Sequence, residues 1–97
     1  MFHVVFTQAA RAELLDAQHW YEGESPGLGR RFREEVGVII ERISSAPLQF
    51  PTVYQSVRRA LLRRFPYMLF FMVDGDTLLV IACFHASRDP RRWQERV

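Results

Sequence analysis

With 97 residues, of which 48% are hydrophobic, the chain can bury one core but not two, and it is too apolar to be disordered. It has no run of about 18 uncharged apolar residues and no signal-peptide pattern, and its single cysteine, Cys83, cannot form an internal disulfide. The net charge of +2 is unevenly distributed: residues 1–55 have five Arg and seven acidic residues, whereas residues 56–97 have eight Arg and four acidic residues. We therefore expect one cytoplasmic domain, residues 1–97, whose second half offers a basic surface to an anionic partner.

The first predicted elements are a strand and a helix. Residues 3–6 have the pattern of a short strand, and Thr7 is placed to cap a helix, because its hydroxyl can accept a free N–H of the first turn. We expect this helix to reach about Tyr21 and to end at Gly23. Its apolar stripe, at helical spacing, consists of Ala10, Leu14, Ala17 and Tyr21.

A second helix is predicted to follow, with Ser25 as its N-cap and Pro26 in its first position. It should stop before Pro47, which cannot continue a helix. Its core-facing residues repeat every three or four positions: Leu28, Phe32, Val36, Ile39 and Ile43. The opposite face is charged, and we expect it to be solvated.

Residues 47–56 are predicted to form a loop, because Pro47 and Pro51 disfavour regular structure around Phe50. Three strands are expected, at residues 57–62, 67–73 and 77–84. The last two are joined by Asp74-Gly75-Asp76, which is typical of a hairpin turn. The resulting order β-α-α-β-β-β predicts an α+β fold in which a helical hairpin packs on a small, mainly antiparallel sheet.

The hairpin turn determines which side chains share a face. With a two-residue loop, odd positions of one strand pair with even positions of the other. One face then holds Tyr67, Leu69, Phe71, Val80, Ala82 and Phe84, and the other holds Met68, Phe70, Met72, Ile81, Cys83 and His85. A three-residue loop would swap these assignments. Both faces are apolar, so if the helices cover one, the second needs its own cover, such as a partner chain.

Four arginines surround the strand predicted at residues 57–62. Strand alternation would send Arg59 and Arg63 to one side and Arg58 and Arg64 to the other. Such pairs could hold a phosphate backbone or an acidic peptide, because the guanidinium group binds both bidentately. Alternatively, the charges protect an edge strand against aggregation, and the complete absence of lysine reflects codon usage.

The last strand leads into His85 and then Arg88, Asp89 and Pro90. His85 could act as a general base or bind phosphate, although a local hydrogen bond at the strand end is the more ordinary role. Asp89 is expected to cap a short helix that Pro90 begins. The basic tail contains Arg88, Arg91, Arg92 and Arg96 around Trp93, which we expect to anchor the tail by packing. The sequence lacks metal-ligand spacing, a phosphate-binding loop and a dinucleotide fingerprint, so we expect no cofactor.

Taken together, these features resemble the RelE/ParE toxin superfamily over nearly the whole chain. They comprise the element order, the Arg-rich strand, Arg64-Phe65-Pro66-Tyr67 at the start of the hairpin, and His85-x-x-Arg88-Asp89-Pro90 followed by Trp93 and Arg96. The resemblance implies the toxin of a bacterial type II toxin–antitoxin system. It also implies a cognate antitoxin protein that wraps the toxin, and contact with operator DNA only through that antitoxin.

The superfamily offers two mechanisms of growth inhibition. ParE-like members inhibit DNA gyrase, which can serve plasmid stabilisation, whereas RelE-like members cleave mRNA on the ribosome. The His85–Asp89 ending is more similar to the ParE branch, and the chain lacks the lysines and the C-terminal tyrosine of the RelE branch. A gyrase inhibitor would need no catalytic residue, and a metal-free endoribonuclease would use Arg58, Arg59, Arg63 and His85. A degenerate toxin that only binds its antitoxin is the third alternative. The residues expected to bind target or antitoxin are Arg58, Arg59, Arg63, Arg64, Tyr67, His85, Arg88, Arg91, Arg92, Trp93 and Arg96.

Overall fold

The structure is a computed structural model that describes residues 2–97. In chain order its elements are β1 (His3–Phe6), α1 (Gln8–Glu24), α2 (Leu28–Ser45), the short 3₁₀ helix η1 (Pro47–Gln49), β2 (Thr52–Tyr54), β3 (Val57–Leu61), β4 (Tyr67–Asp74), β5 (Thr77–His85) and α3 (Arg91–Gln94). The strands form one five-stranded sheet in the order β1-β5-β4-β3-β2, in which β1 is parallel to β5 and the other neighbours are antiparallel. The predicted α+β fold is confirmed.

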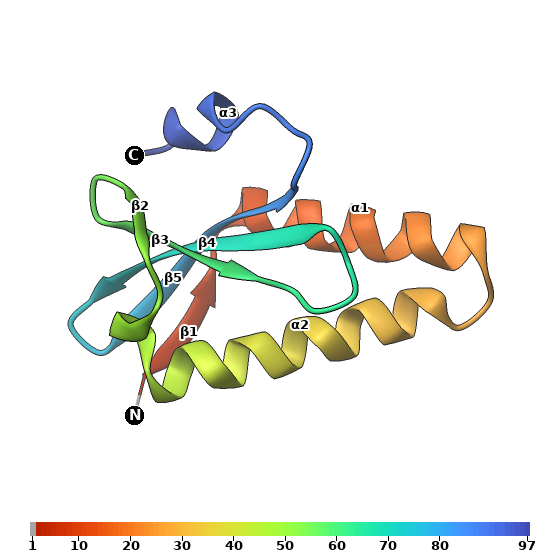
Figure 1. Cartoon of the computed structure of the whole chain (residues 1–97), viewed down its shortest axis with the longest axis horizontal. Helices are drawn as coiled ribbons and strands as arrows, with labels where there is room; N and C mark the ends of the chain where they lie inside the picture. Colours follow the sequence, from red (N-terminus) through yellow and green to blue (C-terminus); the bar gives the residue numbers. More distant parts are fainter. Residues whose placement is uncertain (1) are drawn as a thin grey trace.

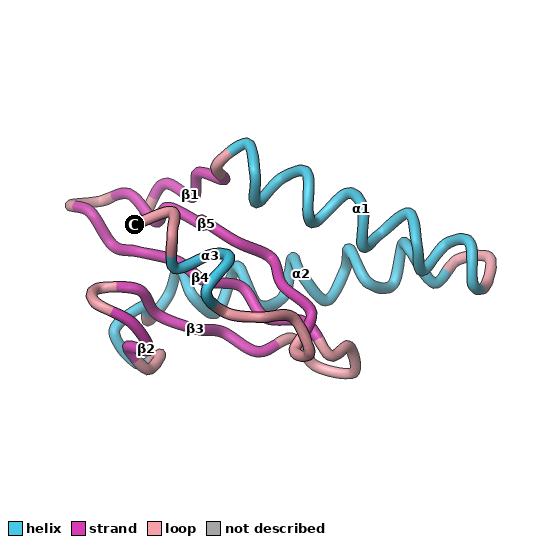
Figure 2. Tube along the Cα trace, turned by 90° about the horizontal axis from the view of Figure 1, so that it is seen from above, coloured by secondary structure: helices cyan, strands magenta, loops and turns pink. Residues whose placement is uncertain are grey.

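The two long helices and the C-terminal helix lie on opposite faces of the sheet. Figure 1 shows α1 and α2 as an antiparallel hairpin along one face, with α3 beyond the other face. The turned view in Figure 2 places α3 over β4 and β5 and shows the tip of the helical hairpin extending past the strands. Within residues 2–97, no helix is long and apolar enough to cross a membrane.

The start of α1 follows the prediction, and its end does not. Thr7 caps the helix: its hydroxyl oxygen accepts a hydrogen bond from the backbone N–H of Ala10 at 3.1 Å. Gly23 was expected to end the helix, but α1 continues to Glu24 and Ser25 is its C-cap. A glycine inside a helix costs only about 1 kcal/mol, which tertiary packing of the same helix readily offsets.

The predicted start of α2 was two residues too early, because Ser25 and Pro26 belong to the connection. The N-cap is Gly27, which has a φ of 88° and so lies in a region that favours glycine. The free N–H groups of Gly27 and Gly29 donate instead to the Glu22 carboxylate of α1, at 2.9 and 3.1 Å. A Cβ on Gly29 would lie 2.6 Å from the Gln18 carbonyl oxygen, so this glycine lets the two helices approach closely.

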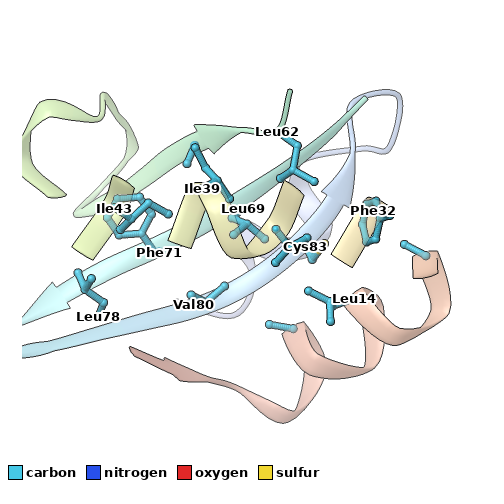
Figure 3. Close-up of a cluster of buried hydrophobic side chains, with 14 of the residues drawn as sticks. Leu14, Phe32, Ile39, Ile43, Leu62, Leu69, Phe71, Leu78, Val80 and Cys83 are labelled. Carbon is cyan, nitrogen blue, oxygen red and sulfur yellow. The ribbon is translucent and has the colours of Figure 1, made fainter. Parts of the chain in front are cut away.

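The main core lies between the helical hairpin and the sheet. Phe32, Val36, Ile39 and Ile43 of α2 are at most 3% exposed, and Leu28 packs against them partly buried, as the periodicity predicted. Figure 3 shows this cluster: Leu14 from α1, Phe32, Ile39 and Ile43 from α2, and Leu62, Leu69, Phe71, Leu78, Val80 and Cys83 from the sheet side. The side chains of both helices therefore converge on the central strands β4 and β5.

The loop predicted at residues 47–56 is partly regular. Pro47 begins η1, and β2 starts directly after Pro51 and pairs with β3 through Thr52–Arg58 and Tyr54–Val57. As the outermost strand, β2 has only one neighbour, so a proline at its boundary costs no ladder hydrogen bond. Prolines therefore mark the ends of these short elements rather than excluding them.

A β-bulge in β5 overturns the predicted face assignment for the four residues that follow it, Ala82 to His85. From the turn inwards the pairs are Val73–Leu78, Met72–Leu79 and Phe71–Val80, as a two-residue loop requires. The register then shifts by one, so that Phe70 pairs with Ala82 and Tyr67 with His85. The extra residue is Ile81. Beyond it, Cys83 and His85 face the helices with Leu69 and Tyr67, while Ala82 and Phe84 face the opposite side.

The second apolar face of the sheet is covered by the chain's own tail. Trp93 is 2% exposed, and its ring stacks on Phe70 with centroids 4.1 Å apart and an interplanar angle of 23°. Tyr54 meets the same indole edge-on at 5.9 Å. The prediction that Trp93 anchors the tail is therefore confirmed, and this part of the sheet needs no partner chain to shield it.

Candidate partner-binding surface

The two arginines within β3 lie on opposite faces of the sheet, as strand alternation predicted. Arg58 pairs with Phe71 on the helix side, and its guanidinium donates to the carbonyl of Phe50 at 2.7 Å. Arg59 pairs with Phe70 on the tail side, and its Nε is shielded from solvent. Arg58 thus holds η1 and the start of β2 in place, whereas Arg59 faces the segment that contains Trp93.

The alternation expected for Arg63 and Arg64 does not apply, because β3 ends at Leu61. Both residues lie in the turn before β4, and Arg64 adopts a φ of 69°, which is unusual for a residue other than glycine. Arg64 borders a hollow of about 360 Å³ together with Glu34 and Glu35 of α2. The four arginines of the predicted constellation are therefore dispersed over both faces and one turn.

His85 is engaged in local contacts at the end of β5. Its Nδ1 accepts a hydrogen bond from the backbone N–H of Ser87 at 3.0 Å, and the Ser87 hydroxyl lies 2.8 Å from the same atom. Its ring meets Tyr67 edge-on at 5.2 Å, and Tyr67 packs against Phe32 of α2. The imidazole is therefore turned towards the helix side of the sheet, while His85 also lines the hollow that Arg59 borders.

Ion pairs organise the tail that follows β5. Asp89 accepts a hydrogen bond from the backbone N–H of Arg91 at 3.0 Å, and its carboxylate also accepts two side-chain hydrogen bonds from that arginine, from Nε at 3.0 Å and from Nη2 at 2.7 Å. The Arg91 guanidinium lowers the pKa of the Asp89 carboxyl, and the carboxylate in turn raises the pKa of Arg91. The formal N-cap is Pro90, one residue after the predicted Asp89, although the Asp89 side chain does bind the first turn.

Glu13 connects α1 to the tail and to β5, a role that the sequence did not predict. This α1 side chain is 14% exposed and accepts hydrogen bonds from Arg96 Nη1 at 3.1 Å, from Arg96 Nη2 at 2.6 Å and from the backbone N–H of Cys83 at 3.1 Å. Arg88 Nη1 lies 3.9 Å from the same carboxylate. The pairing of β1 with β5 ends at Val80, and beyond it Glu13 binds an open strand edge. One sequence feature could have indicated this role of Glu13. It is an acidic residue with no predicted partner beside the apolar stripe of the first helix.

A second hollow lies on the helix side, away from the tail. It measures about 220 Å³ and is lined by Phe6, Leu14, Val36, Gly37, Ile40 and two arginines, Arg11 and Arg33. The lining is apolar in the centre and cationic at the margin. A groove of this kind suits an amphipathic segment with acidic residues beside its apolar ones.

These observations define a small α+β domain that presents arginines from a helical hairpin, a turn and a C-terminal tail, in the manner of RelE/ParE-type toxins. The chain belongs to the family described as ParE toxin of type II toxin–antitoxin system, parDE, which matches residues 4–90. Among solved structures it is similar to a chain of the chromosomal ParDE toxin–antitoxin system from P. aeruginosa. That match has 19% sequence identity and a TM-score of 0.77, and it covers 88% of this chain and 96% of the other. Comparison with curated protein sequences finds no match.

Proposed function

We propose that this ParE-family toxin inhibits growth by binding and inhibiting DNA gyrase, and that a cognate antitoxin restrains it. The observation that supports this mechanism over RNA cleavage is that the expected acid–base group, His85, is engaged in local contacts. The bulge at Ile81 turns its ring towards Tyr67, although His85 and Arg59 border the same hollow. A metal-free ribonuclease needs its acid–base group and its phosphate-binding cations within about 3 Å of the same reacting atoms.

The hydrogen bonding of His85 supports the same conclusion. A backbone N–H can only donate, so the hydrogen bond from Ser87 places the free lone pair of neutral His85 on Nδ1. The proton of the neutral ring is then on Nε2, which leaves that nitrogen unable to accept a proton from a 2′-hydroxyl. The Arg58 guanidinium is also engaged within the fold, since it donates a hydrogen bond to the Phe50 carbonyl. Gyrase inhibition requires surface and charge but no proton transfer.

For the antitoxin, the groove between the helices is a better surface than the apolar sheet face for which the sequence predicted a cover. The chain's own tail covers much of the apolar sheet face, whereas the groove lined by Phe6, Leu14 and Ile40 is open. Arg11 and Arg33 at its margin would pair with acidic residues of the bound segment. The basic half of the chain supplies further charge complementarity.

The proposal is tested by adding purified toxin to two reactions in parallel. One reaction measures supercoiling of relaxed plasmid by gyrase, and the other maps mRNA cleavage in a translating ribosome mixture. We expect supercoiling to be inhibited in a dose-dependent manner and the mRNA to remain intact. Codon-specific cleavage with unaffected gyrase would overturn the proposal in favour of a ribosome-dependent endoribonuclease, and inactivity in both reactions would indicate a degenerate toxin that only binds its antitoxin.

A further inference from the structure

A hollow of about 270 Å³ separates the sheet from the C-terminal tail. Arg59 of β3, Phe70 of β4 and Phe84 of β5 form one wall, and Arg88, Trp93 and Gln94 of the tail form the other. The residues that line it include two arginines and His85, and no aspartate or glutamate. The hollow therefore combines apolar walls with an excess of positive charge.

Two of the residues that line this hollow each have a buried hydrogen-bond donor with no acceptor among the described residues. The donors are Nε of Arg59 and the indole Nε1 of Trp93, a residue that is 2% exposed. Leaving a buried donor unsatisfied costs about 1–3 kcal/mol, and native structures rarely tolerate it without a bound group that accepts the hydrogen. Both residues line the same hollow, which is where an acceptor from outside the chain would approach them.

Arg88 adds a cation at the mouth of the same hollow. Its guanidinium carbon lies 4.1 Å above the centre of the Phe84 ring, and its side chain is 39% exposed. Its only acidic neighbour among residues 2–97 is Glu13, at 3.9 Å, which already binds Arg96 more closely. Arg88 is thus positioned to contact an incoming anion while it remains stacked on the aromatic ring.

We infer that this hollow binds the carboxylate of a glutamate or aspartate that a protein partner presents beside apolar side chains. A nucleic acid backbone fits the surface less well, because phosphates need a continuous row of cations. The neighbouring arginines do not supply one: Arg58 lies on the other face, Arg91 is paired with Asp89, and Arg96 is paired with Glu13. Two cations, Arg59 and Arg88, between aromatic walls suit a single acidic side chain. The inference rests on the proposed function only in requiring a protein partner.

Nuclear magnetic resonance can test the inference directly, because the chain contains two tryptophans. Trp93 lines the hollow, whereas Trp20 lies in α1 and is 59% exposed, so its indole N–H signal is an internal control. The probes are the peptide acetyl-Leu-Glu-Leu-amide, its Gln counterpart, and a thymidine tetranucleotide. We expect the Glu peptide to move the Trp93 signal and leave the Trp20 signal unchanged. The Gln peptide should bind at least about tenfold more weakly, since it lacks the charge-assisted hydrogen bonds.

Matched variants test whether the Glu peptide binds in the hollow. Arg59→Gln should reduce affinity for the Glu peptide about tenfold or more, and Arg30→Gln, which removes the same charge from the exposed face of α2, should leave it unchanged. Arg88→Gln provides a second variant, at a side chain that is 39% exposed. Equal binding of the Gln peptide, equal movement of both indole signals, or tighter binding of the tetranucleotide would each overturn the inference. Gyrase is absent from this titration, so its outcome is independent of the supercoiling assay.

Discussion

The carboxylate of Glu13 and the guanidinium of Arg96, which are separated by 83 positions in the sequence, form two parallel hydrogen bonds of 3.1 and 2.6 Å. Arg96 also donates to the Ile81 carbonyl at 2.8 Å, and Glu13 accepts from the Cys83 N–H. The ion pair thus connects the first helix, the bulge of β5 and the last residues of the tail. The tail is thereby part of the fold.

Replacing Glu13 should destabilise the protein and loosen the tail. Glu13→Ala leaves Arg96 and the Cys83 N–H without their acceptor, and we expect a loss of about 1–3 kcal/mol in the free energy of unfolding. Urea denaturation measures this loss, and hydrogen exchange should show faster exchange at Trp93 and Arg96. Asp16→Ala, an exposed acidic residue of the same helix, is the matched control and should change stability by less than about 0.5 kcal/mol. If hydrogen exchange in the tail of Glu13→Ala were unchanged, the connection between α1 and the tail would be contradicted.

Trp93 should contribute far more to stability than Trp20. Truncating a buried aromatic side chain costs about 3–5 kcal/mol, so Trp93→Ala should lower the urea midpoint strongly. Trp20→Ala, in an exposed position, should change it little. A consequence is that deleting residues 88–97 would remove activity through unfolding as well as through lost contacts. Similar midpoints for the two variants would mean that the tail is not docked in solution.

Phe32 is the central side chain of the helix face that packs on the sheet. It is 0% exposed, and its ring contacts those of Tyr21, Phe65 and Tyr67 at 5.3 Å each. We expect Phe32→Ala to cost about 3–5 kcal/mol, a large share of the stability of a domain this size. Val38→Ala, on the outer face of the same helix and 46% exposed, serves as the comparison in thermal unfolding. A melting temperature that Phe32→Ala leaves unchanged would show that the helix face is misassigned.

The stability of the folded state should decrease as the pH rises above 9. Burial, together with the nearby Glu13 carboxylate, raises the pKa of the Cys83 thiol from 9.0 to about 12. Between these values the unfolded chain releases the thiol proton while the folded chain retains it, so the stabilisation is complete below about pH 9 and is lost towards pH 12. Burial raises the pKa of Tyr21 and Tyr67 as well, which adds a loss of the same sign above about pH 10.

The Cys83 contribution is isolated by comparing the wild type with Cys83→Ala. Urea midpoints measured from about pH 8 to about pH 10 should fall more steeply in the wild type, because only its unfolded state has a thiol to ionise. Cys83→Ala should be less stable at every pH, because the substitution creates a small cavity. Its urea midpoint should depend less steeply on pH. Parallel slopes would indicate that the thiol is accessible to water in the folded state.

His85→Gln distinguishes the two mechanisms of growth inhibition. If the protein inhibits gyrase, this substitution should change the inhibitory concentration by less than about threefold, since it removes one local hydrogen bond and no catalytic group. An acid–base role would instead make the loss about 10²–10⁴-fold. The double variant Arg91→Glu, Arg92→Glu should weaken inhibition strongly, and Arg30→Glu, an equally exposed arginine on α2, should not. A weakening of mRNA cleavage by His85→Gln, with gyrase unaffected, would contradict the proposed target.

The sequence alone determined the elements with strong local signals. The apolar spacing of Phe32, Val36, Ile39 and Ile43, the cap at Thr7 and the turn at Asp74–Asp76 each depend on contacts between residues close in the chain. The family, and with it the expected antitoxin, also followed from residues that could be read in order. By contrast, β2 was missed because its short segment has no periodicity of its own and is formed by pairing with β3.

Only the tertiary structure decided which chemical groups meet. The bulge at Ile81 adds one residue to one strand, and a shift of one residue reverses every side chain beyond it, so the His85 ring meets Tyr67. No local pattern specifies such a bulge, which is stabilised by Glu13 and Arg96 from opposite ends of the chain. Spacing along a strand predicts faces only while the register is regular, and the register here depends on a contact between residues 70 positions apart.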